Sequence, residues 1–184
     1  HELATSLAKL GHEVSVVTRA ATAHSTVDFE EGVWIHRIVP HYQPERKQPM
    51  LPDIPQVTKD YAFTSYDEVM RIAQIRELDI VSAPIWDLEG IACVASGLIP
   101  TVTSLHTTFE LCKPFKPEWN QNNDYEKNHV GKIIQGEKYL LKHSRFILAN
   151  SESIAKEVIA SNPSVDIRSK LKWCRTVLLI LQML

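Results

Sequence analysis

Cysteine is scarce in this chain of 184 residues, and its three copies form no C-x-x-C pair. Cys93, Cys112 and Cys174 are an odd and dispersed set, which argues against a disulfide framework and indicates a reducing compartment. The eight histidines are scattered without the spacing of metal ligands, so we expect no metal site. Neither G-x-G-x-x-G nor G-x-x-x-x-G-K-S/T occurs, which leaves dinucleotide and P-loop chemistry without support.

An excess of one charge is lacking as well. The chain carries 20 Lys and Arg against 22 Asp and Glu, so a basic surface for nucleic acid is not expected. No secretory signal pattern opens the chain, and the final apolar run is too short to span a membrane. We therefore expect a cytoplasmic protein.

The chain does contain enough apolar sequence for one packed α/β domain. Hydrophobic residues make up 44% of it and charged residues 23%, which is typical of a folded chain and not of a disordered one. Short β-branched runs predict strands at residues 13–18, 33–39, 78–83, 101–106 and 145–149. Apolar periodicity predicts helices at residues 1–10, 61–77, 88–97, 128–143 and 151–161. This alternation indicates βαβ units and a doubly wound parallel sheet.

Three stretches are expected to lack regular structure. Residues 20–32 are small and polar, which predicts a loop. Five of the ten prolines fall between Pro40 and Pro55, and that density excludes a helix or a central strand there. Residues 107–125 mix aromatic, proline and polar residues, so they are expected to be irregular.

Candidate functional residues follow two of the predicted strands, where ligand-facing groups collect in open parallel sheets. His106 ends one strand, and an imidazole donates or accepts hydrogen bonds near neutral pH. Thr107 and Thr108 add hydroxyl groups, although loop threonines commonly bond their own backbone instead.

A second group of candidates follows the strand that ends at Ala83. Trp86 offers an aromatic face for stacking on sugar C–H groups, and Asp87 and Glu89 offer carboxylates that accept hydrogen bonds from hydroxyls. The alternative for Asp87 is that it caps the helix that follows. Together these residue types predict a site for a hydroxyl-bearing ligand.

Aromatic and basic residues in the irregular stretch have simpler interpretations. Phe109, Phe115 and Trp119 are expected to pack in the core more than to line a pocket. Lys113 and Lys116 are expected to be solvated surface residues.

Four segments, in this order, resemble the N-terminal part of family 4 glycosyltransferases. They are HELATSLAKLGHEVSVVT at residues 1–18, DIVSAPIWDLEG at 79–90, TVTSLHTT at 101–108 and FILANSESIA at 146–155. The first is similar to the family pattern ELA-x-x-LA-x-x-GHEV-x-V-x-T. The third resembles the family strand that ends in a histidine. The resemblance covers roughly residues 1–161.

The resemblance implies the GT-B fold, in which two Rossmann-like domains face each other across a cleft. The N-terminal domain of that fold holds the acceptor, and the C-terminal domain holds the nucleotide-sugar donor. We therefore expect a Rossmann-like acceptor-side domain at residues 1–161 that lacks the first strand of the family. Residues 162–184 are expected to be an atypical tail or a truncated linker.

The implied activity is transfer of a sugar from a nucleotide sugar to an acceptor hydroxyl, with retention and without metal or cofactor. The acceptor would be a small molecule, a glycan or a lipid, and the chain of residues 1–184 alone is expected to be inactive. The expected catalytic residue is His106. The expected acceptor-binding residues are Trp86, Asp87, Glu89, Thr107 and Thr108. The alternative is a non-catalytic Rossmann-like binding module that requires a partner chain.

The end of the chain, LKWCRTVLLILQML at residues 171–184, does not resemble the family linker. Three interpretations stay open. It is a shifted or cut sequence, a basic and apolar segment for peripheral membrane contact, or a strand at residues 177–184 that completes or extends the sheet. A domain with an open cleft face is also expected to self-associate.

Overall fold

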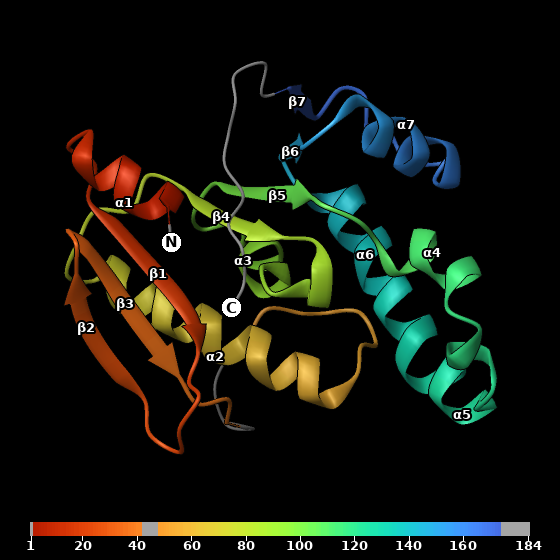
Figure 1. The fold of residues 1–184 in the computed structure, drawn as a ribbon, viewed down its shortest axis with the longest axis horizontal. Coiled ribbons are helices and arrows are strands. Elements are labelled where there is room, and N and C mark those ends of the chain that lie inside the picture. Colours follow the sequence, from red (N-terminus) through yellow and green to blue (C-terminus); the bar gives the residue numbers. More distant parts are fainter. Residues whose placement is uncertain (1, 42–47, 174–184) are drawn as a thin grey trace.

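The computed structural model describes residues 2–41 and 48–173. The first part of the chain forms a three-stranded sheet preceded by a helix (Figure 1). Its elements are α1 (Glu2–Lys9), β1 (Val14–Arg19), β2 (Thr26–Glu30) and β3 (Val33–Ile38). β3 lies between the other two strands, parallel to β1 and antiparallel to β2.

The strand β2 corrects the prediction of a loop at residues 20–32. A two-residue turn of Glu31 and Gly32 joins β2 to β3, and both residues have positive φ, 50° and 84°. Two consecutive left-handed residues are the signature of a hairpin turn whose twist matches that of the strands. All five residues of β2 are exposed, and its two apolar residues, Val27 and Phe29, alternate with polar ones instead of forming a continuous apolar run.

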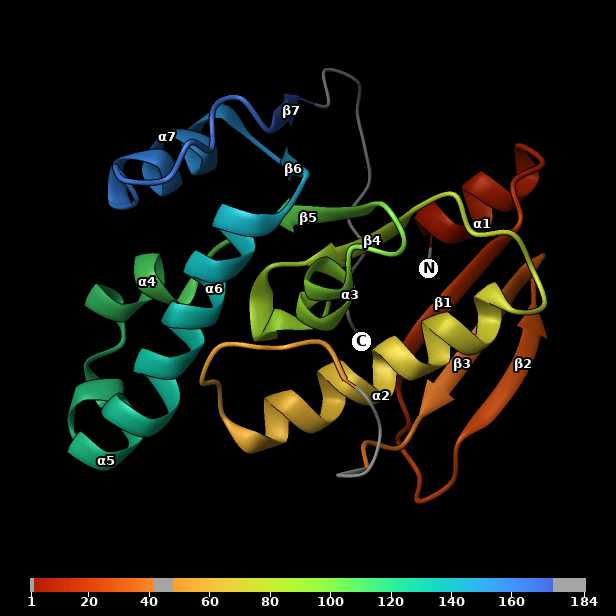
Figure 2. The same ribbon diagram turned by 180° about the vertical axis from the view of Figure 1, so that it is seen from behind.

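The rest of the chain builds a second sheet of four parallel strands in the order β4-β5-β6-β7. These strands are β4 (Val81–Pro84), β5 (Thr101–Leu105), β6 (Phe146–Ala149) and β7 (Leu171–Trp173). The longer helices are α2 (Gln56–Ala73), α3 (Ile91–Ser96), α6 (Gly131–His143) and α7 (Glu152–Ser161). A mixed α/β fold with helices flanking a parallel sheet is a Rossmann-like arrangement, as the sequence predicts (Figure 2).

Short helical turns replace the irregular stretch expected at residues 107–125. They are α4 (Phe109–Cys112), η2 (Lys113–Phe115), η3 (Pro117–Asn120) and α5 (Asn123–Tyr125), and the π-helical η4 (Glu126–Val130) leads into α6. One further turn, η1 (Trp86–Leu88), follows β4. The prediction of irregular structure was therefore wrong for these short helical turns. Proline is well tolerated at the first positions of a helical turn, where it stands in η2 and η3.

The last strand and the outer edges of the two sheets complete the fold. The sheet continues to Trp173, beyond the boundary expected at residue 161. Within the part of the chain that the structure describes, no strand pairs with the outer edge of β1 or of β4. The strand hypothesis for residues 177–184 lies outside the described residues.

Two hydrophobic cores stabilise the two sheets. The larger core packs α2, α3, α6 and α7 around the four-stranded sheet, and the smaller one lies between α1 and the three-stranded sheet. Ile85, Leu88 and Leu105 are fully buried in the larger core, and each such side chain contributes roughly 1.5–3 kcal/mol. α2 packs against both β1 and α3, so it joins the two sheets.

A close approach fixes the chain just after β4. A Cβ atom on Gly90 would lie 2.6 Å from the Cβ of Ala83, so only glycine lets the start of α3 pack this tightly on the strand. The loop between Ala83 and Gly90 is therefore held at both of its ends.

Replacing Gly90 with alanine should destabilise the fold by about 1–3 kcal/mol, because the Cβ of Ala83 is attached to a strand and cannot move away. Urea unfolding followed by circular dichroism measures the change. The double variant with Ala83→Gly restores the space and should recover most of the loss, beyond what Ala83→Gly alone predicts. Strictly additive losses would contradict the close approach.

Candidate functional site

Two loops that the sequence singles out leave the same edge of the sheet. β4 and β5 are neighbours and parallel, with Val81 opposite Thr101 and Pro84 opposite Ser104. The turn that carries Trp86 and the segment that begins at His106 therefore both follow the carboxyl ends of their strands. We call this the carboxyl edge, and it is where ligands bind in open parallel sheets.

The turn after β4 has an uncommon backbone. Asp87 and Leu88 have positive φ, 54° and 60°, in succession, and neither is glycine. A non-glycine residue in this conformation costs on the order of 1–3 kcal/mol, and it persists only where the surrounding structure holds it there. The side chain of Leu88 is fully buried in the larger core, which holds the turn in this form and leaves Asp87 exposed. The alternative interpretation, that Asp87 caps the helix that follows, is wrong because α3 begins at Ile91 with Gly90 at its N-cap.

The two carboxyl groups of this turn titrate unusually. Burial raises the pKa of Glu89 to about 7, with a further upward contribution from Asp87, and Arg19 opposes both. Desolvation also raises the pKa of Asp87, and His129 and Arg19 offset part of that rise. Carboxyl groups with raised pKa values at strand ends are typical of functional sites.

Arg19 and Tyr61 join this cluster from the other sheet and from α2. Arg19 is the last residue of β1, and its guanidinium carbon lies 4.5 Å from the centroid of the Tyr61 ring. Burial raises the pKa of Tyr61 to about 12, and the nearby Glu89 carboxylate adds to the shift. The strand-end rule would have found Arg19. Tyr61 lies within a helix far away in the sequence and gave no such signal.

His106 is oriented from the next strand. Asn150, which directly follows β6, donates its amide N–H to Nδ1 of His106 at 2.5 Å. Burial lowers the pKa of His106, so its ring is mostly neutral at pH 7. With Nδ1 accepting, the ring proton is on Nε2, and that atom is left to donate a hydrogen bond.

The two threonines after His106 differ in what they can do. Thr108 is buried, and its hydroxyl accepts the N–H of Leu111 at 3.1 Å as the N-cap of α4. Thr107 places its hydroxyl 3.4 Å from the sulfur of Cys112. Backbone capping thus occupies the hydroxyl of Thr108, as the simpler interpretation expects.

A row of three aromatic rings includes Trp86 of this turn. The Phe109 ring lies between Trp86 and Trp119, with centroid distances of 4.5 Å and 4.8 Å. Phe109 is buried, which agrees with the core role expected for it, but Phe115 is 82% exposed and the expectation of core packing was wrong there. One face of the Trp86 ring is therefore engaged by protein.

The two lysines of this segment form surface ion pairs. Lys113 pairs with Glu126 at 2.6 Å and Lys116 with Glu118 at 3.6 Å. This agrees with the surface role expected for both, and such pairs contribute little stability.

One functional candidate, Glu137 on α6, was missed by sequence reasoning. Its carboxylate is buried and accepts the backbone N–H of Phe109 at 2.7 Å and that of Glu110 at 3.4 Å. Burial raises its pKa to about 7 against the opposing effect of these two hydrogen bonds. A signal was present, because Glu137 lies at helical spacing from Ile133 and Leu141 on the apolar face of the helix.

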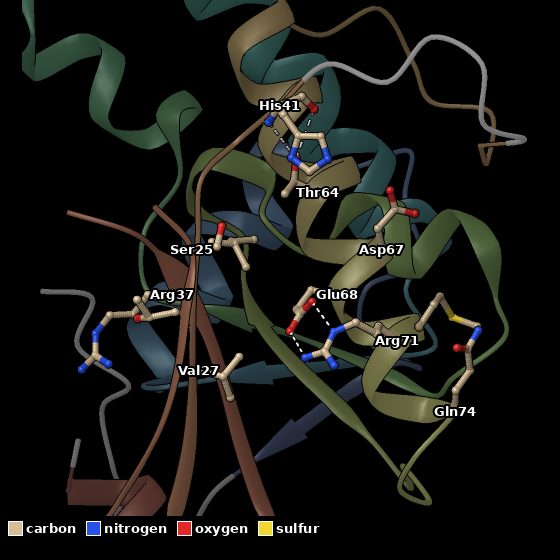
Figure 3. A pocket seen from close by; sticks show the side chains of 12 residues that line it. Ser25, Val27, Arg37, His41, Thr64, Asp67, Glu68, Arg71 and Gln74 are labelled. Atoms are coloured by element: carbon tan, nitrogen blue, oxygen red, sulfur yellow. Dashed lines mark hydrogen bonds and ion pairs between the residues drawn. The ribbon is translucent and has the colours of Figure 1, made fainter. Parts of the chain in front are cut away.

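A second polar region, a hollow of about 620 Å³, lies between the β2–β3 hairpin and α2 (Figure 3). In it, Glu68 binds Arg71 through two hydrogen bonds of 2.6 Å and 2.9 Å. Ser25 accepts the N–H of Val39, and Arg37 points away from the hollow toward Asp28. Because these polar groups bind one another, the hollow offers less to a ligand than the carboxyl edge does.

The described residues contain neither a metal-binding cluster nor a membrane-spanning helix. Residues 2–41 and 48–173 hold no group of three or more His, Cys, Asp or Glu side chains placed to bind a metal ion. None of the helices in those ranges has the length and apolar character required to cross a membrane.

Comparison with known proteins identifies the family of the chain. The model of a protein family described as Glycosyltransferase Family 4 matches residues 1–168 of the chain. A search of curated proteins finds no match.

The Glu89 carboxyl should make stability fall as the pH rises. The unfolded chain loses this proton near pH 4.5 and the folded chain near pH 7, so the stability that the group contributes below pH 4.5 is lost as the pH rises to about 7. Solvent screening at a partly buried group reduces the effect to about 1–2 kcal/mol.

Urea unfolding at several pH values between 4.5 and 8 tests this for Glu89→Gln. The variant should lack that part of the pH dependence, whereas the same change at the exposed Glu77 should leave the wild-type slope. Identical slopes for the wild type and Glu89→Gln would exclude a titrating Glu89.

Proposed function

Because the chain belongs to glycosyltransferase family 4, we propose that its carboxyl edge holds the acceptor in sugar transfer from a nucleotide sugar. Membership of this family indicates that the chain has a glycosyltransferase-type function. The assignment of the acceptor to this edge is supported by the convergence of Asp87, Glu89 and His106 after two neighbouring parallel strands. Retention and independence of metal are part of the proposal and rest on the family resemblance.

In the proposal the carboxyl edge contributes to catalysis by positioning the acceptor hydroxyl. Transfer requires an acceptor hydroxyl to be held against the anomeric carbon of the donor, and orientation of this kind contributes a large part of catalysis. In the proposal Asp87 and Glu89 accept hydrogen bonds from acceptor hydroxyls, and His106 donates one from Nε2. The remaining requirement, stabilisation of the departing diphosphate, falls to groups that bind the donor.

The supporting residues have different parts in the proposal. Arg19 stacks on Tyr61, which fixes its guanidinium beside the two carboxyl groups and limits their repulsion. Trp86 presents the part of its ring that Phe109 does not cover. Thr107 remains a hydroxyl ligand in the proposal, and Thr108 acts through the backbone that it caps.

The His106→Ala variant should weaken acceptor binding about tenfold, because one oriented hydrogen bond is lost together with the contact of the ring. The acceptor is identified by screening monosaccharides, polyols and glycolipid head groups by NMR, and its affinity is then measured by calorimetry. His143→Ala is the matched control, since His143 lies exposed at the end of α6, before β6 begins and so away from the carboxyl edge. Equal losses in both variants would contradict the assignment.

Asp87→Asn should raise the dissociation constant of the acceptor about 10- to 100-fold, the range expected when a hydrogen bond loses its charge. Asparagine tolerates the left-handed backbone of this position, so the turn should keep its form. Asp79→Asn makes the same chemical change at the exposed residue two positions before β4 and should leave the affinity unaltered. If Asp87→Asn binds as the wild type does, Asp87 is not an acceptor ligand.

A further inference from the structure

We propose that Glu137 is a positioning residue whose protonation state controls how firmly the loops of the carboxyl edge are held. In its ionised form the carboxylate holds the start of α4, and with it the 106–108 segment and the ring on which Trp86 packs. In its protonated form it releases part of that hold. We call the hydrogen bonding of Glu137 to the start of α4 the clamp. Its effect on acceptor binding rests on the proposed function, whereas the clamp itself does not.

The clamp is needed because α4 is too short to be stable alone. It has four residues, and the first N–H groups of any helix lack partners within the helix. Glu137 accepts the first two of them, from Phe109 at 2.7 Å and Glu110 at 3.4 Å, and Thr108 accepts the third, from Leu111. One side chain from a distant helix thus supplies most of what holds this turn.

The position of α4 is transmitted to both candidate loops. Phe109 directly follows the 106–108 segment, so fixing its N–H also fixes the chain that leads back to His106. Its ring lies against Trp86 at 4.5 Å. A Cβ on the adjacent Gly136 would lie 2.2 Å from Leu88, so α6 packs directly on the turn that carries Asp87.

The charges around Glu137 favour its neutral form. Burial is the main cause, and Glu110 on α4 and Asp87 on η1 add repulsion, so its pKa lies at about 7. The neighbouring cation, Lys138, is directed to Glu110 at 2.8 Å. From the other packed elements, Asn162, the C-cap residue after α7, also binds Glu110, and His129 of η4 lies at the edge of the Phe109 ring.

Protonation changes what the carboxyl group can accept. An ionised carboxylate is acceptor-only and serves both N–H groups. A protonated one carries an O–H donor on one oxygen and opposes one of the two N–H groups. Glu137 therefore holds the start of α4 through two hydrogen bonds above neutral pH and through one below it, in addition to the bond from Leu111 to Thr108.

The experiment follows the amide protons of Phe109 and Glu110 by NMR from pH 5 to pH 9 in the full chain. The wild type should show one shared transition near pH 7, with the Trp86 and His106 signals following it. Glu137→Gln should abolish the transition. Glu110→Gln, the matched control, should keep the transition and move its midpoint to lower pH, because one repelling charge is gone.

Two results would overturn the proposal. One is a wild-type Phe109 amide whose shift does not change between pH 5 and pH 9. The other is a transition that persists in Glu137→Gln. Should that variant not fold, the wild type and Glu110→Gln decide, because an unmoved midpoint in Glu110→Gln assigns the transition to another group.

Acceptor affinity then separates the clamp from the proposed function. In the wild type the affinity should rise from pH 5.5 to pH 8.5. Glu137→Gln should reduce this rise about fivefold, the effect of one hydrogen bond, and should keep the part that ionisation of Glu89 contributes. If the amide transition is present but no acceptor binds to any form, the proposed function fails and the clamp stands. If the acceptor binds and the amide transition is missing, only the clamp fails.

Discussion

The parallel pairing of β4 with β5 is the constraint on which the candidate site depends. Parallel neighbours end at the same edge, so pairing Pro84 with Ser104 is enough to bring the turn at Trp86 beside the segment at His106. The next strand, β6, adds Asn150 at the same edge and orients the imidazole. β1 contributes Arg19 through its contact with Tyr61 on α2, the helix that joins the two sheets. Residues from four separate parts of the chain meet there as a result.

Burial of carboxyl groups gives this edge its electrostatic character. Asp87, Glu89 and Glu137 all have raised pKa values, and desolvation is the first cause for each, although Asp87 is exposed, Glu89 is partly buried and only Glu137 is fully buried. Partial compensation comes from Arg19 for the first two and from backbone N–H groups for the third. Ionised carboxylates in such surroundings destabilise the fold, and groups of this kind are retained where a site requires them. The strained backbone at Asp87 and Leu88 belongs to the same pattern.

The hollow beside α2 shows why polarity alone does not identify a site. Glu68 and Arg71 bind each other there, and Nδ1 of His36 donates to the same carboxylate at 2.5 Å. These contacts stabilise the packing of α2 on the hairpin. At the carboxyl edge, in contrast, Asp87 is exposed and the Nε2 atom of His106 is left as a donor by its tautomer. The difference lies in which polar atoms already have protein partners.

Local sequence by itself determined the strands β4, β5 and β6 of the parallel sheet with the helices around them, the family, and the candidates at Trp86, Asp87, Glu89 and His106. It could do so because periodicity and strand-end position are short-range properties. Only the tertiary structure showed the strands β2 and β7, the Arg19–Tyr61 contact and the clamp from Glu137. The contact, the clamp and the pairing of β7 join groups that are distant in sequence, and β2 has only two apolar residues, both exposed. Partners across 28 residues, as for Glu137 and Phe109, are chosen by packing, which no local pattern encodes.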